Sequence, residues 1–384
     1  MEKSIPILWK EKDECCGCSA CLAICPVHAI EMQTDKKGFL YPKIDATKCV
    51  RCGNCVKICS FKNDRKEYSI EETKIYAAKA SEEIVKVSSS GGLFTVLSDC
   101  ILNEAGAIIS AIYNPFEHEV DFEIYFDEIM RNSARGSKYI QAEMNDIFVK
   151  GYEWIKKNPD KKLLFVGTGC QSAGFKAYVE KKGIRDKTII IDVICHGAPS
   201  PGLWKKYAKY IENKNGGELS YITFKDKRNG WMNPSVYGVI NGQEVSIEGY
   251  SNWFYGGYSI RESCYSCPYT KVNRSTDLTI GDFWGVKERF PDFFDSNGVS
   301  LILTHTKIGE DFFNRIKGKV SWREISKQDC QQPRLNSPAQ KPQKYNCFWD
   351  DINTKGIEYC EDEYKEENKV SLKFRIKKIL KNIW

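Results

Sequence analysis

The first 60 residues hold nine of the 17 cysteines of this 384-residue chain. Eight of the nine form two runs with the same spacing, Cys-x2-Cys-x2-Cys-x3-Cys, and a proline follows the first run. In two-cluster bacterial ferredoxins this spacing wraps three cysteines around one 4Fe-4S cluster and sends the fourth to the other cluster. The runs comprise Cys15, Cys18, Cys21 and Cys25, and Cys49, Cys52, Cys55 and Cys59.

Crossed ligation divides these eight cysteines into two predicted ligand sets. The first set is Cys15, Cys18, Cys21 and Cys59, and the second is Cys49, Cys52, Cys55 and Cys25. A pair of zinc sites is the alternative, but zinc typically takes two CxxC pairs separated by a longer loop. Cys16 is surplus, since only Cys15 gives the two-residue spacing. We therefore predict a bacterial-type dicluster ferredoxin domain over residues 1–62.

Hydropathy and charge narrow the class of protein. The N-terminus is charged and lacks the apolar region of a signal peptide, and no apolar run reaches the roughly 20 residues that span a bilayer. The expected location is the cytoplasm, where thiols stay reduced and clustered cysteines are typically metal ligands. The net charge of +6 equals the charge of residues 369–384 alone. Because the rest of the chain is neutral, we expect no nucleic-acid partner.

Residues 369–384 predict a basic amphipathic helix, with Leu372, Ile376 and Leu380 on one face and lysines on a neighbouring stripe. Three interpretations stay open for this tail: packing on its own domain, docking to a partner, and peripheral contact with an anionic membrane.

The middle of the chain has the pattern of an α/β fold. Residues 163–170 and 188–195 are continuous aliphatic runs that predict strands buried on both faces, and residues 171–183 between them predict a helix. A third buried strand is expected over 277–285, and Asn241-Gly242 predicts a type I′ hairpin.

The expected fold class is therefore α+β or α/β. The ferredoxin domain is followed by an α/β domain over residues 75–330. From about residue 331 the chain is rich in proline, glutamine and asparagine, which predicts an extended arm over 331–368.

Four further cysteines suggest a second kind of site. Cys170 and Cys195 end the two predicted parallel strands, and Cys264 and Cys267 form a CxxC pair. Because parallel strands end at the same edge of a sheet, the four thiols are candidates for one four-cysteine site. The alternative is two buried core cysteines and a CxxC with a structural or no ligand.

A serine- and glycine-rich segment precedes an apolar helical pattern. Backbone N–H groups at such a helix start, together with the hydroxyls of Ser89 and Ser90 and the open backbone of Gly91 and Gly92, suit a pyrophosphate. A serine-rich helix cap without a ligand is the commoner explanation of this pattern.

Several motifs in a fixed order resemble the family of coenzyme F-420 hydrogenase/dehydrogenase beta subunits. They are the dicluster block, SSSGGLFTVL (88–97), RGSKYIQ (135–141), GTGCQ (167–171), CHG (195–197) and CYSCPY to DLTIGDFWG (264–285). The resemblance covers the chain to about residue 350. It departs at Gly169, where the family usually has proline, and this predicts a less rigid loop before Cys170.

The resemblance implies a FAD site and a third 4Fe-4S cluster held by Cys170, Cys195, Cys264 and Cys267. Ser137, Lys138 and Tyr139 are then candidates for a second flavin-binding segment, with Lys138 near the electron-rich edge of the ring. Without the resemblance, Lys138 is a surface-loop lysine. Asp282 is a candidate for binding ribityl or ribose hydroxyls, or else a turn residue.

The predicted function is that of an iron–sulfur flavoprotein oxidoreductase working under anaerobic conditions. Electrons pass between the ferredoxin clusters and FAD, and then to or from a two-electron acceptor, either the deazaflavin coenzyme F-420 or another small molecule. The alternative is an electron-relay subunit without a substrate of its own that serves a partner enzyme, for example one linked to polysaccharide synthesis. The expected partner is a redox protein or a small-molecule acceptor. The sequence identifies no catalytic side chain.

Overall fold

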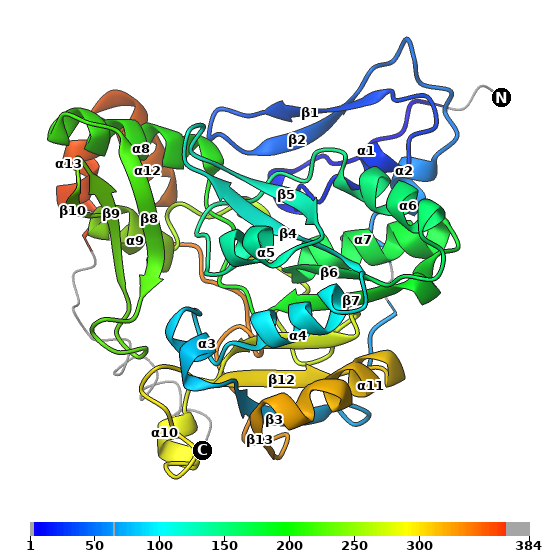
Figure 1. Cartoon of the computed structure of the whole chain (residues 1–384). Coiled ribbons are helices and arrows are strands. Elements are labelled where there is room, and N and C mark those ends of the chain that lie inside the picture. The colour runs from blue at the N-terminus through cyan, green and yellow to red at the C-terminus, as the bar shows by residue number, and fades with distance from the viewer. Residues whose placement is uncertain (1–3, 64–65, 366–384) are drawn as a thin grey trace.

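The computed structural model describes residues 4–63 and 66–365 and is built around an eight-stranded mixed sheet (Figure 1). Its strands are β3 (Lys74–Lys79), β4 (Ala107–Asn114), β5 (Glu119–Tyr125), β6 (Leu163–Thr168), β7 (Thr188–Val193), β11 (Leu278–Asp282), β12 (Ser300–Thr304) and β13 (Ser321–Glu324). They lie in the order β13-β3-β12-β11-β7-β6-β4-β5. The four central strands β11, β7, β6 and β4 are parallel, and the strands outside them pair antiparallel.

Helices cover both faces of this sheet, as the aliphatic runs predicted. Ile109 of β4 and Ile190 of β7 belong to one core, and their neighbours Ile108 and Ile189 belong to the core on the opposite face. The first face carries α6 (Ile147–Lys157) and α7 (Gly169–Lys181). The second face carries α4 (Leu93–Leu102), α5 (Glu128–Ala134) and α11 (Lys307–Ile316).

The two predicted strands and the helix between them are confirmed, with one shift in boundary. Cys170 was expected at the end of a strand, but α7 already begins at Gly169. The side-chain carbonyl of Gln171 accepts a hydrogen bond from the backbone N–H of Thr168 at 3.0 Å, which closes the helix start early. Cys170 therefore lies in the first turn of a 13-residue helix.

A second lobe contains the sheet β8 (Leu219–Asp226), β9 (Ser235–Ile240) and β10 (Gln243–Ser246), with helices α8 (Pro201–Asn215) and α9 (Glu248–Tyr255). Asn241 and Gly242 join β9 to β10 with φ values of 51° and 76°. Both are positive, as a type I′ turn requires, so the predicted hairpin is confirmed.

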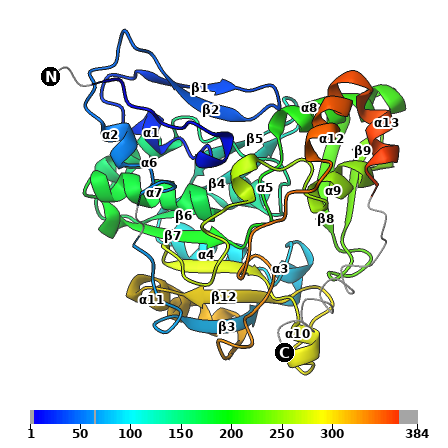
Figure 2. The ribbon, with the colours of Figure 1, turned by 180° about the vertical axis from the view of Figure 1, so that it is seen from behind.

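The prediction of an extended arm over residues 331–368 is wrong in its second half. Residues 345–363 form α12 (Tyr345–Thr354) and α13 (Gly356–Glu363) (Figure 2). Tyr345, Phe348, Trp349 and Ile352 are buried at helical spacing, and this apolar face packs into the core of the second lobe. The predicted tail helix over 369–384 lies outside the described residues.

The cysteine-rich block packs on the α6–α7 face. It contains β1 (Ile30–Thr34), β2 (Leu40–Ile44) and the short helices α1 (Ala20–Ala23) and α2 (Asn54–Lys57). Ala20 and Ile24 share one continuous core with Phe175 of α7, so the block does not stand apart from the sheet domain.

The remaining helices of the described chain are short. They are the α-helices α3 (Glu82–Lys86) and α10 (Val286–Arg289), and the 3-10 helices η1 (Lys12–Glu14), η2 (Arg185–Lys187), η3 (Glu262–Cys264) and η4 (Lys317–Lys319). Between residues 4 and 365, leaving out 64 and 65, none of the helices has both the length and the apolar character needed to cross a membrane.

A glycine pair fixes the contact between the β1–β2 hairpin and α8. A Cβ atom placed on Gly202 would lie 2.7 Å from the Cα of Gly38, a backbone atom that cannot rotate away. We predict that Gly202→Ala destabilises the protein by about 1–3 kcal/mol, although alanine is the better helix former. Thermal unfolding followed by circular dichroism tests this. Gly318→Ala is the control, because its Cβ meets open space. Equal melting temperatures of the two variants would contradict the prediction.

Candidate cluster and cofactor sites

The two cysteine runs fold into loops with matching backbone conformations. Gly17 and Arg51, each two residues after the first cysteine of its run, have φ values of 73° and 56°. Ser19 and Gly53, the N-caps of α1 and α2, have φ values of 59° and 73°. The match holds only if Cys15 corresponds to Cys49, which agrees with the choice of Cys15 over Cys16.

The thiols of the two runs surround two cavities in the crossed grouping. One cavity is lined by Cys25, Cys49, Cys52 and Cys55. The other is lined by Cys15, Cys18, Cys21 and Cys59 and also by Cys16 and Cys55, so Cys55 lines both cavities. In residues 4–63 and 66–365, no three His, Cys, Asp or Glu side chains are arranged to hold a metal ion. An iron–sulfur cluster is larger than a single metal ion, so its cysteine ligands surround a cavity instead of converging on one point. Ligation of the clusters by these cysteines stays a prediction.

The four later cysteines come together between the sheet and the second lobe. Cys195 follows β7, Cys264 ends η3 and Cys267 follows in the next loop. Burial raises the pKa of Cys195 to about 12, and the neighbouring Cys170 and Cys267 contribute to this rise. Burial also raises the pKa of Cys264 well above its usual value, and the other three thiols add to this effect. A metal centre would supply the positive charge that these thiols need to ionise.

The surplus cysteine, Cys16, lies between two of the predicted centres. A hydrogen bond with Cys16 lowers the pKa of the Cys170 thiol to about 7. Hydrogen bonds with Cys170 and Cys18 raise the pKa of Cys16, whose side chain is buried. A Cβ atom on Gly174 of α7 would lie 2.9 Å from the Cys18 Sγ, so this glycine permits the close approach. The first cysteine run and the four-cysteine group therefore touch through Cys16.

Two buried arginines flank this contact. Arg261 is 1% exposed and donates to the carbonyl oxygens of Cys15 at 2.7 Å and Leu40 at 2.9 Å. Its guanidinium also donates to Gln141 at 3.2 Å, and the Gln141 amide donates to the Cys16 carbonyl at 2.9 Å. Arg261 thus connects the ferredoxin block to the second lobe beside two thiol groups.

Arg274 gives an independent test of whether the four-cysteine group fits an iron–sulfur cluster. It is 2% exposed, and its Nη1 lies 3.4 Å from Asp192, but its Nε and Nη2 atoms have no hydrogen-bond partner among the described residues. Its charge opposes the rise that burial causes in the pKa of Cys195. A buried cation that is incompletely paired is costly. Thiolate-ligated clusters are anionic, so a cluster at this site would supply the missing negative charge.

The structure places Gly169 in a helix rather than in a loop before Cys170, and the expected lower rigidity stays a prediction. Gly169 is the first residue of α7, and a Cβ atom there would lie 2.7 Å from the Cβ of Tyr269. In this chain Tyr269 fills the space that a proline ring at residue 169 would need, which accounts for the glycine.

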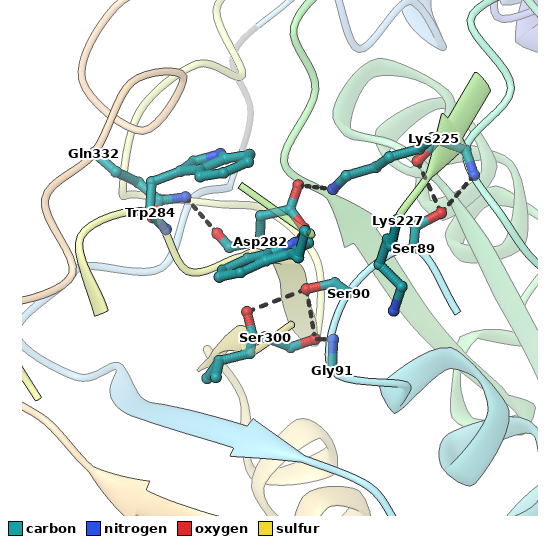
Figure 3. A network of polar contacts seen from close by, with 12 residues as sticks. Ser89, Ser90, Gly91, Lys225, Lys227, Asp282, Trp284, Ser300 and Gln332 are labelled. Carbon is teal, nitrogen blue, oxygen red and sulfur yellow. Dashed lines mark hydrogen bonds and ion pairs between the residues drawn. The ribbon is translucent and has the colours of Figure 1, made fainter. Parts of the chain in front are cut away.

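The predicted flavin segments meet each other. The hydroxyl of Ser89 accepts hydrogen bonds from the backbone N–H of Ser137 at 2.9 Å and from the Ser137 hydroxyl at 3.3 Å (Figure 3). Ser90 donates to the Val299 carbonyl at 3.1 Å. The Ser300 hydroxyl donates to that of Ser90 at 3.2 Å and accepts from the Gly91 N–H at 2.9 Å. The segment before α4 is therefore anchored between the 135–141 loop and β12.

The glycines of this segment have structural roles of their own. A Cβ atom on Gly91 would lie 2.6 Å from the carbonyl oxygen of Ala78 in β3, so the glycine lets the segment pack on the sheet. Gly92 is the N-cap of α4 and has a φ of 82°, which favours glycine. The hydroxyls and lysines around the segment, rather than these glycines, carry the case for a ligand.

Asp282 is already engaged by protein groups. Lys225 forms an ion pair with its Oδ2, and the indole N–H of Trp231 donates to its Oδ1 at 2.9 Å. Trp231 stacks on Trp284 with ring centroids 5.2 Å apart, and Gln332 donates to the Asp282 carbonyl at 2.8 Å (Figure 3). The carboxylate therefore holds Lys225 in place, and its binding to ribityl or ribose hydroxyls stays a prediction.

Two lysines beside the serine segment lack a carboxylate partner among the described residues. Desolvation lowers the pKa of Lys138 to about 7, and its ammonium donates to the carbonyls of Ala134 and Arg135. Desolvation lowers the pKa of Lys227 to about 8, and its ammonium donates to the Asn297 carbonyl at 2.6 Å. An anionic ligand would stabilise the charged form of both amines, so these residues fit a pyrophosphate.

Tyr139 lies between the predicted flavin segment and the four-cysteine group. Its hydroxyl is 2.9 Å from that of Tyr255, and its ring stacks on Phe254 with centroids 4.4 Å apart. Phe254, Tyr139 and Cys264 belong to one apolar group. The aromatic rings therefore connect the predicted flavin segment to the four-cysteine group.

The residues that the sequence did not single out are mostly distant basic side chains. Arg261 and Arg274 carry no local motif, and only the fold brings them to the cysteines. The run KDKR over residues 225–228 was a usable signal, because alternating lysines at the end of a strand place two amines near one another.

Comparison with known proteins gives the class of this chain. Residues 14–63 match the 4Fe-4S dicluster domain, and residues 160–328 match the C terminus of the coenzyme F420 hydrogenase/dehydrogenase beta subunit. The chain is therefore an iron–sulfur protein of an oxidoreductase family. The second match includes Asp282 and all four later cysteines.

Two individual relatives are similar over most of the chain. A subunit of the F(420)H(2) dehydrogenase of Methanosarcina mazei is 23% identical over 336 residues, which cover 83% of this chain and 86% of the relative. A chain of the F420-reducing NiFe hydrogenase complex of Methanosarcina barkeri is 16% identical, with a TM-score of 0.45 over 78% of this chain and 90% of that one. Residues 160–328 are therefore similar to the C terminus of the coenzyme F420 hydrogenase/dehydrogenase beta subunit and follow a 4Fe-4S dicluster domain, in agreement with the resemblance of the motifs.

Proposed function

We propose that the protein is an iron–sulfur flavoprotein that passes electrons along three 4Fe-4S clusters to or from FAD. The observation that carries this proposal is the packing of the first cysteine run on α7, the helix whose first turn holds Cys170. It brings the ferredoxin block and the four-cysteine group together without an intervening layer of protein. Two cavities and one group of four thiols would hold the clusters, with the twelve cysteines as ligands.

The flavin would lie against the segment from Ser89 to Gly92. Ser89, Ser137, Lys138 and Lys227 would bind its phosphates and polar edge, while Tyr139 would separate it from the four-cysteine group. When bound, the clusters carry single electrons and the flavin exchanges them for pairs. Asp282 holds Lys225 through its ion pair, and so keeps a third amine beside the segment.

The proposed acceptor is a two-electron carrier, either the deazaflavin coenzyme F420 or another small molecule. The name of the Methanosarcina mazei relative supports the deazaflavin, because it refers to reduced F420. The second candidate function is an electron-relay subunit without a substrate of its own. The same name supports it, since that relative is one component of a dehydrogenase. Turnover of reduced coenzyme F420 with an artificial dye by the isolated chain would exclude the pure relay.

The metal content tests the three centres together. Anaerobically purified protein should contain about twelve iron and twelve sulfide per chain. Cys195→Ser removes one predicted ligand of the third cluster, so its iron content should fall to about eight. Cys347→Ser is the control, because Cys347 is exposed and belongs to none of the three groups. A wild-type content of about eight iron would contradict the third cluster.

Arg274 should set the reduction potential of that third cluster. Its buried charge favours an added electron, so Arg274→Met should lower the midpoint potential by about 50–100 mV. Redox titration followed by electron paramagnetic resonance measures this, and the two ferredoxin clusters provide an internal reference. Arg228→Met, which removes an exposed ion-paired arginine, should change nothing. An unshifted potential in Arg274→Met would contradict the assignment.

Flavin retention tests the site at Ser89–Gly92. Lys227→Met removes an amine whose hydrogen-bond partners among the described residues are carbonyl oxygens. The flavin released by acid should fall several-fold relative to iron, while the iron content stays at the wild-type level. Lys209→Met, on the exposed side of α8, should retain the wild-type ratio. Flavin-free wild-type protein would remove the flavin from the proposal.

A further inference from the structure

We propose that the outer patch of the ferredoxin block is a docking surface for a small acidic electron-carrier protein. The outer patch consists of Val27 and Val50, which line one cavity with Cys52, and of Val56, Lys48 and Lys57, which are close to Cys52 in the sequence. The proposal goes beyond the cofactor content and acceptor proposed above. It rests only on the dicluster domain, which the comparison establishes.

The centre of the outer patch is apolar and lies over a predicted cluster. Val50 is 59% exposed, Val56 37% and Val27 36%. Val27 and Val50 line the same cavity as Cys49, Cys52 and Cys55, and Cys52 is itself exposed. Exposed apolar side chains that gather at one site indicate a contact surface rather than chance exposure. Here they frame the point at which a cluster comes nearest to solvent.

The rim of the outer patch is basic. Residues 43–62 hold five Lys or Arg and one acidic residue, in a chain whose body is otherwise neutral. Lys48 is 3.5 Å from Asp45, and Lys62 pairs with Glu14. Lys57 is exposed and forms no ion pair with a carboxylate among residues 4–63 and 66–365. The charges of Lys48 and Lys57 are therefore available to attract an acidic protein and to orient it before contact.

The charge and the size of the outer patch indicate which kind of protein binds there. A second copy of this chain would bring the same lysines face to face across a twofold axis, which like charges oppose. Three valines give a small apolar centre, typical of the brief encounters of electron-transfer proteins rather than of permanent subunits. A small acidic carrier satisfies both conditions, because its charge complements the rim and its redox group needs only a brief contact near Cys52.

Stopped-flow reduction of the full chain by an acidic flavodoxin in its hydroquinone form tests the proposal. The blue semiquinone that forms is visible apart from the cluster absorption. The second-order rate constant should fall as the salt concentration rises. The double variant Lys48→Glu and Lys57→Glu should slow reduction about tenfold at low salt. The matched control, Lys209→Glu and Lys319→Glu, makes the same change in net charge on α8 and η4, and should leave the rate unchanged.

The iron content and the cluster absorption of each variant show whether the domain is intact. Val50→Ser adds a second test without changing charge, since it should slow reduction while keeping the wild-type salt dependence. A rate for wild-type protein that does not fall with salt would overturn the proposal. So would equal slowing by the two double variants, which would indicate net charge rather than the outer patch. A wild-type dimer that Val50→Ser dissociates in sedimentation would assign the surface to a second copy instead.

Discussion

The burial of Cys16 between Cys18 and Cys170 is the contact on which the arrangement of the protein depends. It requires the first cysteine run to press against α7, and Gly174 provides the space. Arg261 and Gln141 hold the same loop from the other side, through the carbonyls of Cys15 and Cys16. The ferredoxin block is thus part of the core of the protein, unlike a domain attached by a flexible linker.

This contact also explains why the two cysteine runs, which share one backbone pattern, have different surroundings. The first run is enclosed by α7 and the second lobe, and Cys18 is buried. The second run faces outward, and Cys52 is exposed. The two runs of this internal repeat therefore differ in their surroundings. One site is open to solvent, and the other lies against the four-cysteine group.

Local patterns in the sequence predicted the parts of the fold that depend on neighbouring residues. The spacing of the cysteines, the two aliphatic strands and the Asn241-Gly242 turn are of this kind. The helix from Tyr345 to Thr354 was equally predictable from its i, i+3, i+4 and i+7 apolar residues, but the prolines before it are typical of an extended arm. Arg261 and Arg274 were not predictable, because their roles arise from residues far away in the sequence. For the same reason the engagement of Asp282 by Lys225 and Trp231 was not foreseen.

The positively charged residues differ in burial between the two ends of the proposed electron path. Arg274 and Arg261 lie at the four-cysteine group and at its contact with the first run, where little water is present to screen them. The outer run has basic residues only at its exposed rim, where water and salt weaken their effect. A buried cation favours the reduced form of a nearby cluster more strongly than an exposed one. With the proposed clusters and flavin bound, the two arginines would favour electrons at the inner end of the path, and Asp192, 3.4 Å from Arg274, would offset part of this effect. The proposed direction of electron flow is therefore from the outer patch inward.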